Sequence, residues 1–216
     1  LVVGAALVAW SVAAQALSPY VDADKAAGGT LDAAAADVER KLAGAGLTPL
    51  GRYTPKGLPQ HAILVVGDAG LQDAVAAIGG DAIVAAPLRV DVRADGSVRY
   101  ANPEYWARAY LRGNYPKAEA AVAGASRKLA AALGAGKPGG GDVPAAELPG
   151  YRYMLGMERF GDRTELAEHA SFDEAVATVR ANLAKGVGDT AKVYEIVLPG
   201  KKLAVFGVAL NGSDYG

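Results

Sequence analysis

The stretch SFDEAVATVRANLA, residues 171–184, decides the fold, because the chain contains its skeleton twice. The earlier copy is TLDAAAADVERKLA, residues 30–43, which aligns with the later one at an offset of 141 residues. In each copy the apolar side chains recur with the period of an amphipathic helix. Ser171 and Glu174 form a capping box at the later helix, whereas Ala33 leaves the box of the earlier copy half built. The sequence therefore predicts the same helix at two places.

The similarity between the copies continues past the helices, over about 38 residues with one single-residue gap, as expected for a duplicated structural unit. Tyr53 aligns with Tyr194, and ILVVG at residues 63–67 aligns with LAVFG at residues 203–207. Each copy reads as a helix followed by two β-rich runs. The four runs are residues 47–54 and 61–68 in the first copy, and 191–198 and 202–210 in the second.

The first copy goes on beyond the part that is repeated. A short helix is predicted at residues 70–79, two strands within 82–103 around the turn formed by Asp95 and Gly96, and a helix over 104–136 that breaks near Asn114. A strand is also predicted at residues 151–160. From these elements we predict four parts of the chain: an anchor or signal at 1–17, a first unit at 20–133, a Gly/Pro-rich linker at 134–149 and a second, incomplete unit at 150–216.

Residues 1–17, LVVGAALVAWSVAAQAL, carry no charge. They are compatible with a retained membrane anchor, since roughly 17–20 apolar residues reach the short end of what spans the hydrocarbon. They are also compatible with a signal peptide cleaved at residues 14–16, or with a buried core helix. Apolarity on every face favours the first two. We therefore predict an N-terminal hydrophobic helix that contacts the lipid bilayer, and a protein that is membrane-anchored and faces the periplasm or the cell exterior.

Composition excludes several classes of function. The 22 basic and 23 acidic residues give a net charge of −1, which argues against nucleic acid as a partner, because such binding needs a basic surface. The chain has no cysteine, so it has no disulfide, thiolate nucleophile or Cys-ligated zinc.

Several of these stretches together resemble the domain of unknown function 302 family. They are TLDAAAADVERKLAGAGL, HAILVVGDAGLQDAV and APLRVDVRADGSVRYANPEYWARAY in the first unit, and SFDEAVATVRANLA with KVYEIVLPGKKLAVFGVAL in the second. The resemblance implies an α+β fold in which two tandem units of helices pack on a curved antiparallel sheet, similar to the TATA-binding-protein class. It implies no activity, because the shared motifs are structural.

One segment concentrates side chains that are common at protein interfaces. The possible interaction surface consists of Tyr105, Trp106, Arg108, Tyr110, Arg112 and Tyr115. The alternative is a helix that packs these aromatic rings on its own sheet. Two histidines, His61 and His169, are weak candidates for a metal or haem site with Met154 or Met157, because no metal-binding spacing supports them.

No nucleophile is paired with a base in the sequence, so we predict that the protein is not an enzyme and assign no catalytic, cofactor or metal residues. The predicted function is a non-catalytic, exported accessory or assembly subunit that binds the subunits of a larger membrane protein complex. The alternative is a periplasmic module that binds a small ligand, haem or a metal in a groove between the two units.

Overall fold

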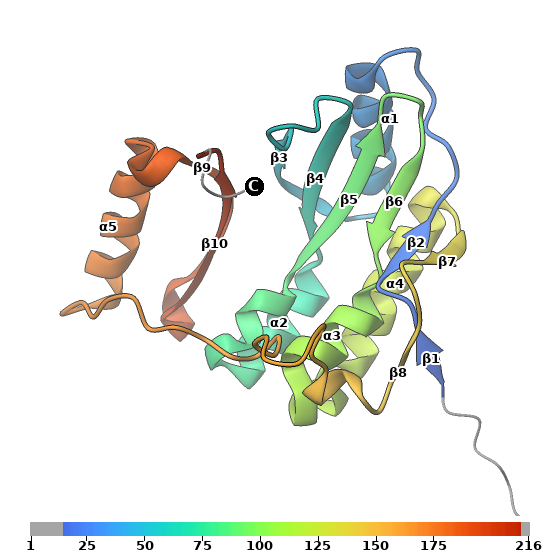
Figure 1. Cartoon of the computed structure of the whole chain (residues 1–216). Helices are drawn as coiled ribbons and strands as arrows, with labels where there is room; N and C mark the ends of the chain where they lie inside the picture. Colours follow the sequence, from blue (N-terminus) through green and yellow to red (C-terminus); the bar gives the residue numbers. More distant parts are fainter. Residues whose placement is uncertain (1–14, 213–216) are drawn as a thin grey trace, which may run out of the picture.

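The structure, a computed structural model, describes residues 15–212 and has an α+β fold. Its centre is a six-stranded antiparallel sheet in the order β3-β4-β5-β6-β2-β7 (Figure 1). The strands of this sheet are β2 (Tyr20–Asp22), β3 (Thr48–Tyr53), β4 (His61–Gly67), β5 (Pro87–Arg93), β6 (Val98–Ala101) and β7 (Lys137–Gly139).

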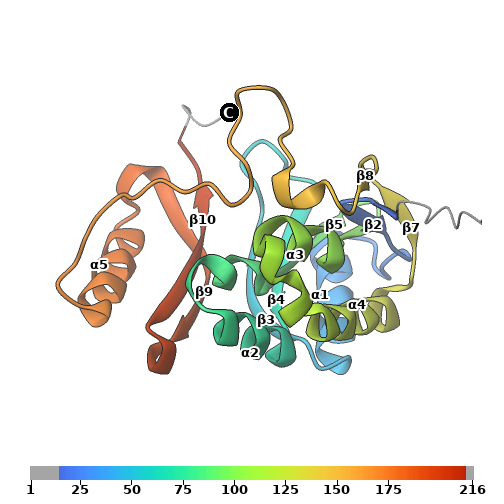
Figure 2. The ribbon, with the colours of Figure 1, turned by 90° about the horizontal axis from the view of Figure 1, so that it is seen from below.

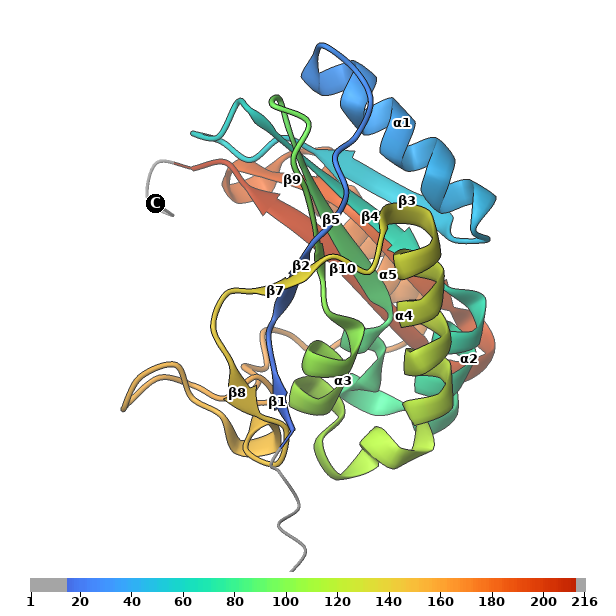
Figure 3. The same cartoon turned by 90° about the vertical axis from the view of Figure 1, so that its right-hand side faces the viewer.

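Helices of the first copy cover one face of the sheet, where α1 and α4 lie side by side (Figure 3). Alternation along β5 turns Leu88, Val90 and Val92 toward this face, where all three are buried. Val38 and Leu42 of α1 are fully buried in the same core cluster. The four helices are α1 (Leu31–Gly44), α2 (Ala69–Ile78), α3 (Pro103–Leu111) and α4 (Glu119–Leu133).

The predicted helix caps form at both copies. The Thr30 hydroxyl accepts a hydrogen bond from the Ala33 amide at 3.2 Å, and the Ser171 hydroxyl accepts one from the Glu174 amide at 3.1 Å. Among the described residues, no return bond joins the Glu174 carboxylate to the Ser171 amide, so the predicted capping box is formed in one direction. Each hydroxyl satisfies one of the helix's four free amides.

The second copy repeats the order of helix, strand and strand. It consists of α5 (Phe172–Ala184), β9 (Thr190–Leu198) and β10 (Leu203–Leu210), and the strands pair as an antiparallel hairpin across η5 (Pro199–Lys201). Arg180 of α5 donates to Glu195 of β9, so Glu195 faces the helix. The adjacent Tyr194 and Ile196 therefore face away from α5.

The face of this hairpin that points away from α5 packs on the first copy, so that the hairpin lies between α5 and the large sheet (Figure 1). Ile196 is buried in the main core cluster, and Tyr194 and Val205 pack against that cluster. At Gly51 of β3 the two copies come very close, because a Cβ atom there would lie 1.9 Å from the carbonyl oxygen of Val193. The edge of the large sheet therefore needs a glycine at this contact.

The prediction of an N-terminal hydrophobic helix is wrong. Ala16–Leu17, at the end of the apolar run, form strand β1, which pairs antiparallel with β8 (Val143–Pro144), and Leu17 is buried against Tyr105 and Leu148. Pairing with β8 satisfies backbone groups that a helix would have satisfied internally. Residues 1–14 of the proposed anchor or signal lie outside the described residues. Within residues 15–212, no helix is long and apolar enough to cross a membrane.

Four other segments differ from the sequence prediction. The second copy contributes a two-stranded hairpin and one helix among the described residues, in place of a second curved sheet. Gly80–Ala85 form the 3₁₀ helix η1 where a strand was predicted to begin. Residues 151–160 form no strand, because Tyr151 and Phe160 stack on each other and Phe160 packs on the aromatic rings of α3. Residues 134–149 carry β7 and β8, both paired with N-terminal strands.

Candidate functional site

The candidate site is the part of the large sheet that neither the helices nor the hairpin covers. Alternation along β5 directs Arg89, Asp91 and Arg93 to this open face, and cross-strand pairing places Arg99 of β6 opposite Asp91. Toward β3, Val65 of β4 is buried although it points to the same face. The hairpin of the second copy crosses there, so the polar side chains remain on the uncovered strands.

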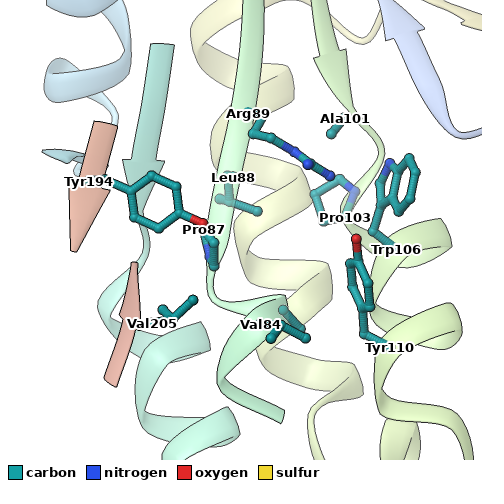
Figure 4. A pocket seen from close by; sticks show the side chains of 11 residues that line it. Val84, Pro87, Leu88, Arg89, Ala101, Pro103, Trp106, Tyr110, Tyr194 and Val205 are labelled. Carbon is teal, nitrogen blue, oxygen red and sulfur yellow. The ribbon is translucent and has the colours of Figure 1, made fainter. Parts of the chain in front are cut away.

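Two adjoining cavities occupy this open face, and we call them together the groove. The larger has a volume of about 620 Å³ and extends over β4, β5 and β6 to Phe160. The smaller has a volume of about 190 Å³ and lies between α3 and the hairpin, where Tyr194 and Val205 form its far wall (Figure 4). The shared lining residues are Arg89, Ala101, Trp106 and Tyr110. The groove is therefore one site built by both copies.

Aromatic rings form the wall of the groove on the α3 side. Trp106 and Tyr110 stack with their centroids 5.9 Å apart and their planes 26° apart, and Phe160 meets the Trp106 ring edge-on at 5.4 Å. The indole nitrogen of Trp106 donates to the Pro19 carbonyl at 2.9 Å, which fixes the orientation of the ring. The segment that carries Phe160 runs past α3 on its way to α5 (Figure 2).

Acidic partners neutralise most cations of the groove. Asp91 bonds to His61 Nδ1 at 2.8 Å through one oxygen and to Arg93 Nε at 3.2 Å through the other. Arg99 donates to Asp22 at 2.5 Å, and this hydrogen bond holds the pKa of the Asp22 carboxyl below its ordinary value.

Arg89 differs from these cations. Its exposed guanidinium lies 5.2 Å from the centre of the Trp106 ring, and within residues 15–212 no carboxylate forms an ion pair with it. Burial raises the pKa of the Tyr194 hydroxyl, while the positive charge of Arg89 acts in the opposite direction. Arg89 is therefore the cation that sets the charge of the groove between the two copies.

The six residues of the predicted interaction surface are separated by the fold. Tyr105 and Tyr115 are buried, and burial raises the pKa of both hydroxyls. Arg108 pairs with Glu104 at 2.8 Å and lies 4.1 Å above the Tyr115 ring. Such contacts hold these three side chains in the first copy.

Of the other three predicted residues, two line the groove and one, Arg112, lines a separate cavity. Trp106 and Tyr110 line the groove, so both the interface interpretation and the packing interpretation describe part of this helix. Arg112 begins the turn after α3 with a φ of +52° and pairs with Asp162 at 3.5 Å. Its Nε atom is buried and has no hydrogen-bond partner among the described residues.

Sequence reasoning did not identify Arg89, Asp91, Phe160 or Tyr194 as site residues. The alternation in PLRVDVR could have placed Arg89 and Asp91 on one face of a strand. No local pattern could have brought Phe160 and Tyr194 to that face, because both arrive through contacts between segments far apart in the sequence.

The histidines do not meet in a metal site. His61 bonds to Asp91, and His169 lies 3.9 Å from Glu174. Met154 and Met157 are exposed in the segment before α5. Within the described part of the chain, no three histidine or carboxylate side chains gather so as to hold a metal ion.

Comparison of the chain with protein-family models, with curated proteins and with solved structures finds no match. The resemblance to the domain of unknown function 302 family stays a prediction from the sequence motifs.

Proposed function

We propose that this chain is a binding protein that holds a small organic molecule in the groove. The observation that supports this function is the continuous groove itself, whose walls come from both copies and whose larger cavity of about 620 Å³ lies in the usual range for ligand sites, roughly 300–1,000 Å³. Aromatic rings on the α3 side and Tyr194 on the hairpin side leave a slot that suits a flat body.

Binding is favoured over catalysis by the side chains that line the groove. Among the described residues, its lining contains no serine, threonine, cysteine or lysine. His61 and Asp91 have the spacing of a base and its orienting carboxylate, but within residues 15–212 no serine, threonine, cysteine or lysine lines the groove beside them. The lining therefore supplies recognition groups in place of a reacting pair.

A neutral aromatic probe tests this proposal. Naphthalene-1-methanol, titrated into ¹⁵N-labelled protein, should shift the Trp106 indole resonance together with amides of β5 and β9. Tyr110→Ala should weaken the response, since it removes part of the slot. Tyr153→Ala is the matched control, because Tyr153 is 75% exposed and does not line the groove. Shifts that spread over the surface, or an equal effect of the two variants, would refute the proposal.

A second function, that of an accessory subunit, is favoured by one other observation. The segment between the copies exposes large apolar side chains, and Leu155 and Leu166 are 101% and 91% exposed. Exposed apolar groups that gather on one segment are typical of protein–protein contacts. A photo-crosslinking residue at position 155 or 166 should capture the same partner in cells, and one at Glu165 should capture less of it. Capture of unrelated proteins at the two positions would count against this function.

A further inference from the structure

We infer that the groove selects a planar or aromatic anion, such as an aryl carboxylate, with its negative group on Arg89 and its flat body against Trp106 and Tyr110. This inference rests on the proposed small-molecule function and adds the chemical class of the ligand. The inference depends on Arg89, because its guanidinium lies over the indole ring at the junction of the two cavities and no described carboxylate neutralises this charge.

The remaining charges of the groove do not serve a cationic ligand. Asp91 is the one carboxylate in the described lining, and both of its oxygens are engaged, one by His61 and one by Arg93. Arg99 is likewise paired with Asp22. A cation entering the groove would therefore meet the positive charge of Arg89 and find no free carboxylate.

The directions of the side chains fit an acid at one end and a ring at the other. In Figure 4, Arg89 extends from β5 toward Trp106, and the hydroxyl of Tyr110 points toward the same region. Tyr194 approaches from the hairpin, across β5 from α3. The Tyr110 and Tyr194 hydroxyls form no hydrogen bond with any other described residue, so both are available to a bound molecule.

Planarity follows from the arrangement of the rings. Trp106 and Tyr110 both line the groove, and the faces of their rings are close to parallel, with planes 26° apart. A flat π-system gains from stacking on such faces, and a guanidinium stacked on an indole keeps its edge donors free for an oxyanion. A branched aliphatic acid would gain the charge interaction and lose the stacking.

The test compares three naphthalene probes of similar size and different charge. 1-Naphthoate, naphthalene-1-methanol and 1-naphthylmethylammonium are titrated at pH 7 into the whole chain, and dissociation constants are taken from shifts of the Trp106 indole resonance. 1-Naphthoate should bind about tenfold or more tightly than the other two, as a charge-assisted hydrogen bond allows. This preference should fall as salt is added, because Arg89 is exposed.

Two variants locate the charge preference. Arg89→Gln keeps a polar side chain at an exposed position and should reduce the preference to within about twofold, as expected when the charge partner is lost. Arg52→Gln is the matched control, since Arg52 lies on β3, pairs with Asp32 and does not line the groove. Circular dichroism of both variants checks the fold.

The outcomes separate the two proposals. If naphthoate binds no more tightly than the alcohol, or if Arg89→Gln keeps the full preference, the inferred ligand class is wrong and the groove stands as a site for neutral molecules. If none of the three probes moves a groove resonance at millimolar concentration, the small-molecule function itself fails.

Discussion

Replacing Gly51 with alanine tests how the second copy is seated on the first. The new Cβ would lie 1.9 Å from the Val193 carbonyl oxygen and 2.8 Å from its carbonyl carbon. Both are backbone atoms of β9, so no side-chain rotation can make room. Either the edge of the large sheet deforms, or the hairpin moves away from it.

These two responses bound the loss of unfolding free energy that Gly51→Ala should cause. Overpacking of this kind typically costs about 1–3 kcal/mol of unfolding free energy. Detachment of the hairpin would expose Ile196, which is now 5% exposed. Moving one buried side chain of this size into water costs about 1.5–3 kcal/mol, and Tyr194 and Val205 would add to this cost. We therefore expect Gly51→Ala to cost about 2–3 kcal/mol, with the strain confined to the contact between the copies.

Guanidinium unfolding and hydrogen exchange measure the two parts of this prediction. The midpoint should fall, and amides of β9 and β10 should lose protection before those of β4 and β5. Gly44→Ala is the control: a Cβ at this last residue of α1 meets nothing within 4 Å, so this variant should be neutral or slightly more stable. An unchanged midpoint for Gly51→Ala, with full protection of the hairpin, would refute the packing described above.

Three further predictions concern individual side chains. Asp68→Ala should cost about 2–4 kcal/mol of stability in a denaturant titration, because buried Asp68 caps α2 through the Leu71 amide, and Asp68→Asn should cost clearly less because it keeps the cap. The pKa of Asp37 is lowered, mainly by its hydrogen bond from Lys41, so the stability that the charged carboxylate contributes is complete above the unfolded pKa of about 3.9 and is lost as pH falls through the folded pKa. Asp37→Asn should therefore be less stable than the wild type at pH 7, and the two stabilities should converge in acid unfolding. A stability difference that does not change with pH would contradict this. Arg112→Gly should raise the melting temperature or leave it unchanged. The substitution relieves about 1–3 kcal/mol of backbone strain at φ +52° and removes a half-exposed ion pair with Asp162 that contributes at most about 1 kcal/mol. A clear fall in the melting temperature would show that the ion pair outweighs the strain.

The local features of the fold could be predicted from the sequence. The helix period, the Thr30 and Ser171 caps and the Asp95–Gly96 turn depend on neighbours within a few residues, and all of them form. Gly96 takes a φ of +81°, as such a turn requires.

The features that could not be predicted depend on distant partners. Strands β1, β7 and β8 have two or three residues each, which is too short to show any period, and each forms because a distant strand offers backbone groups to pair with. Residues 151–160 have the composition of a strand, yet Phe160 packs on the rings of Trp106 and Tyr110 in α3. Tertiary contacts therefore override the local preference in both cases.

The groove itself lies where the second helix–strand–strand segment packs on the first. A two-stranded hairpin is at best marginally stable by itself, and α5 covers only one of its faces, so β9 and β10 must bury the other face on the first copy. Because two strands cannot cover six, part of the open sheet remains uncovered between the hairpin and α3. Tyr53 and Tyr194, which the sequence aligns as equivalents, both face away from their own helices, and each lines one of the two cavities. The two aligned tyrosines thus lie at two ends of a single site, and a variant that detaches the hairpin should remove ligand binding together with the contact at Gly51.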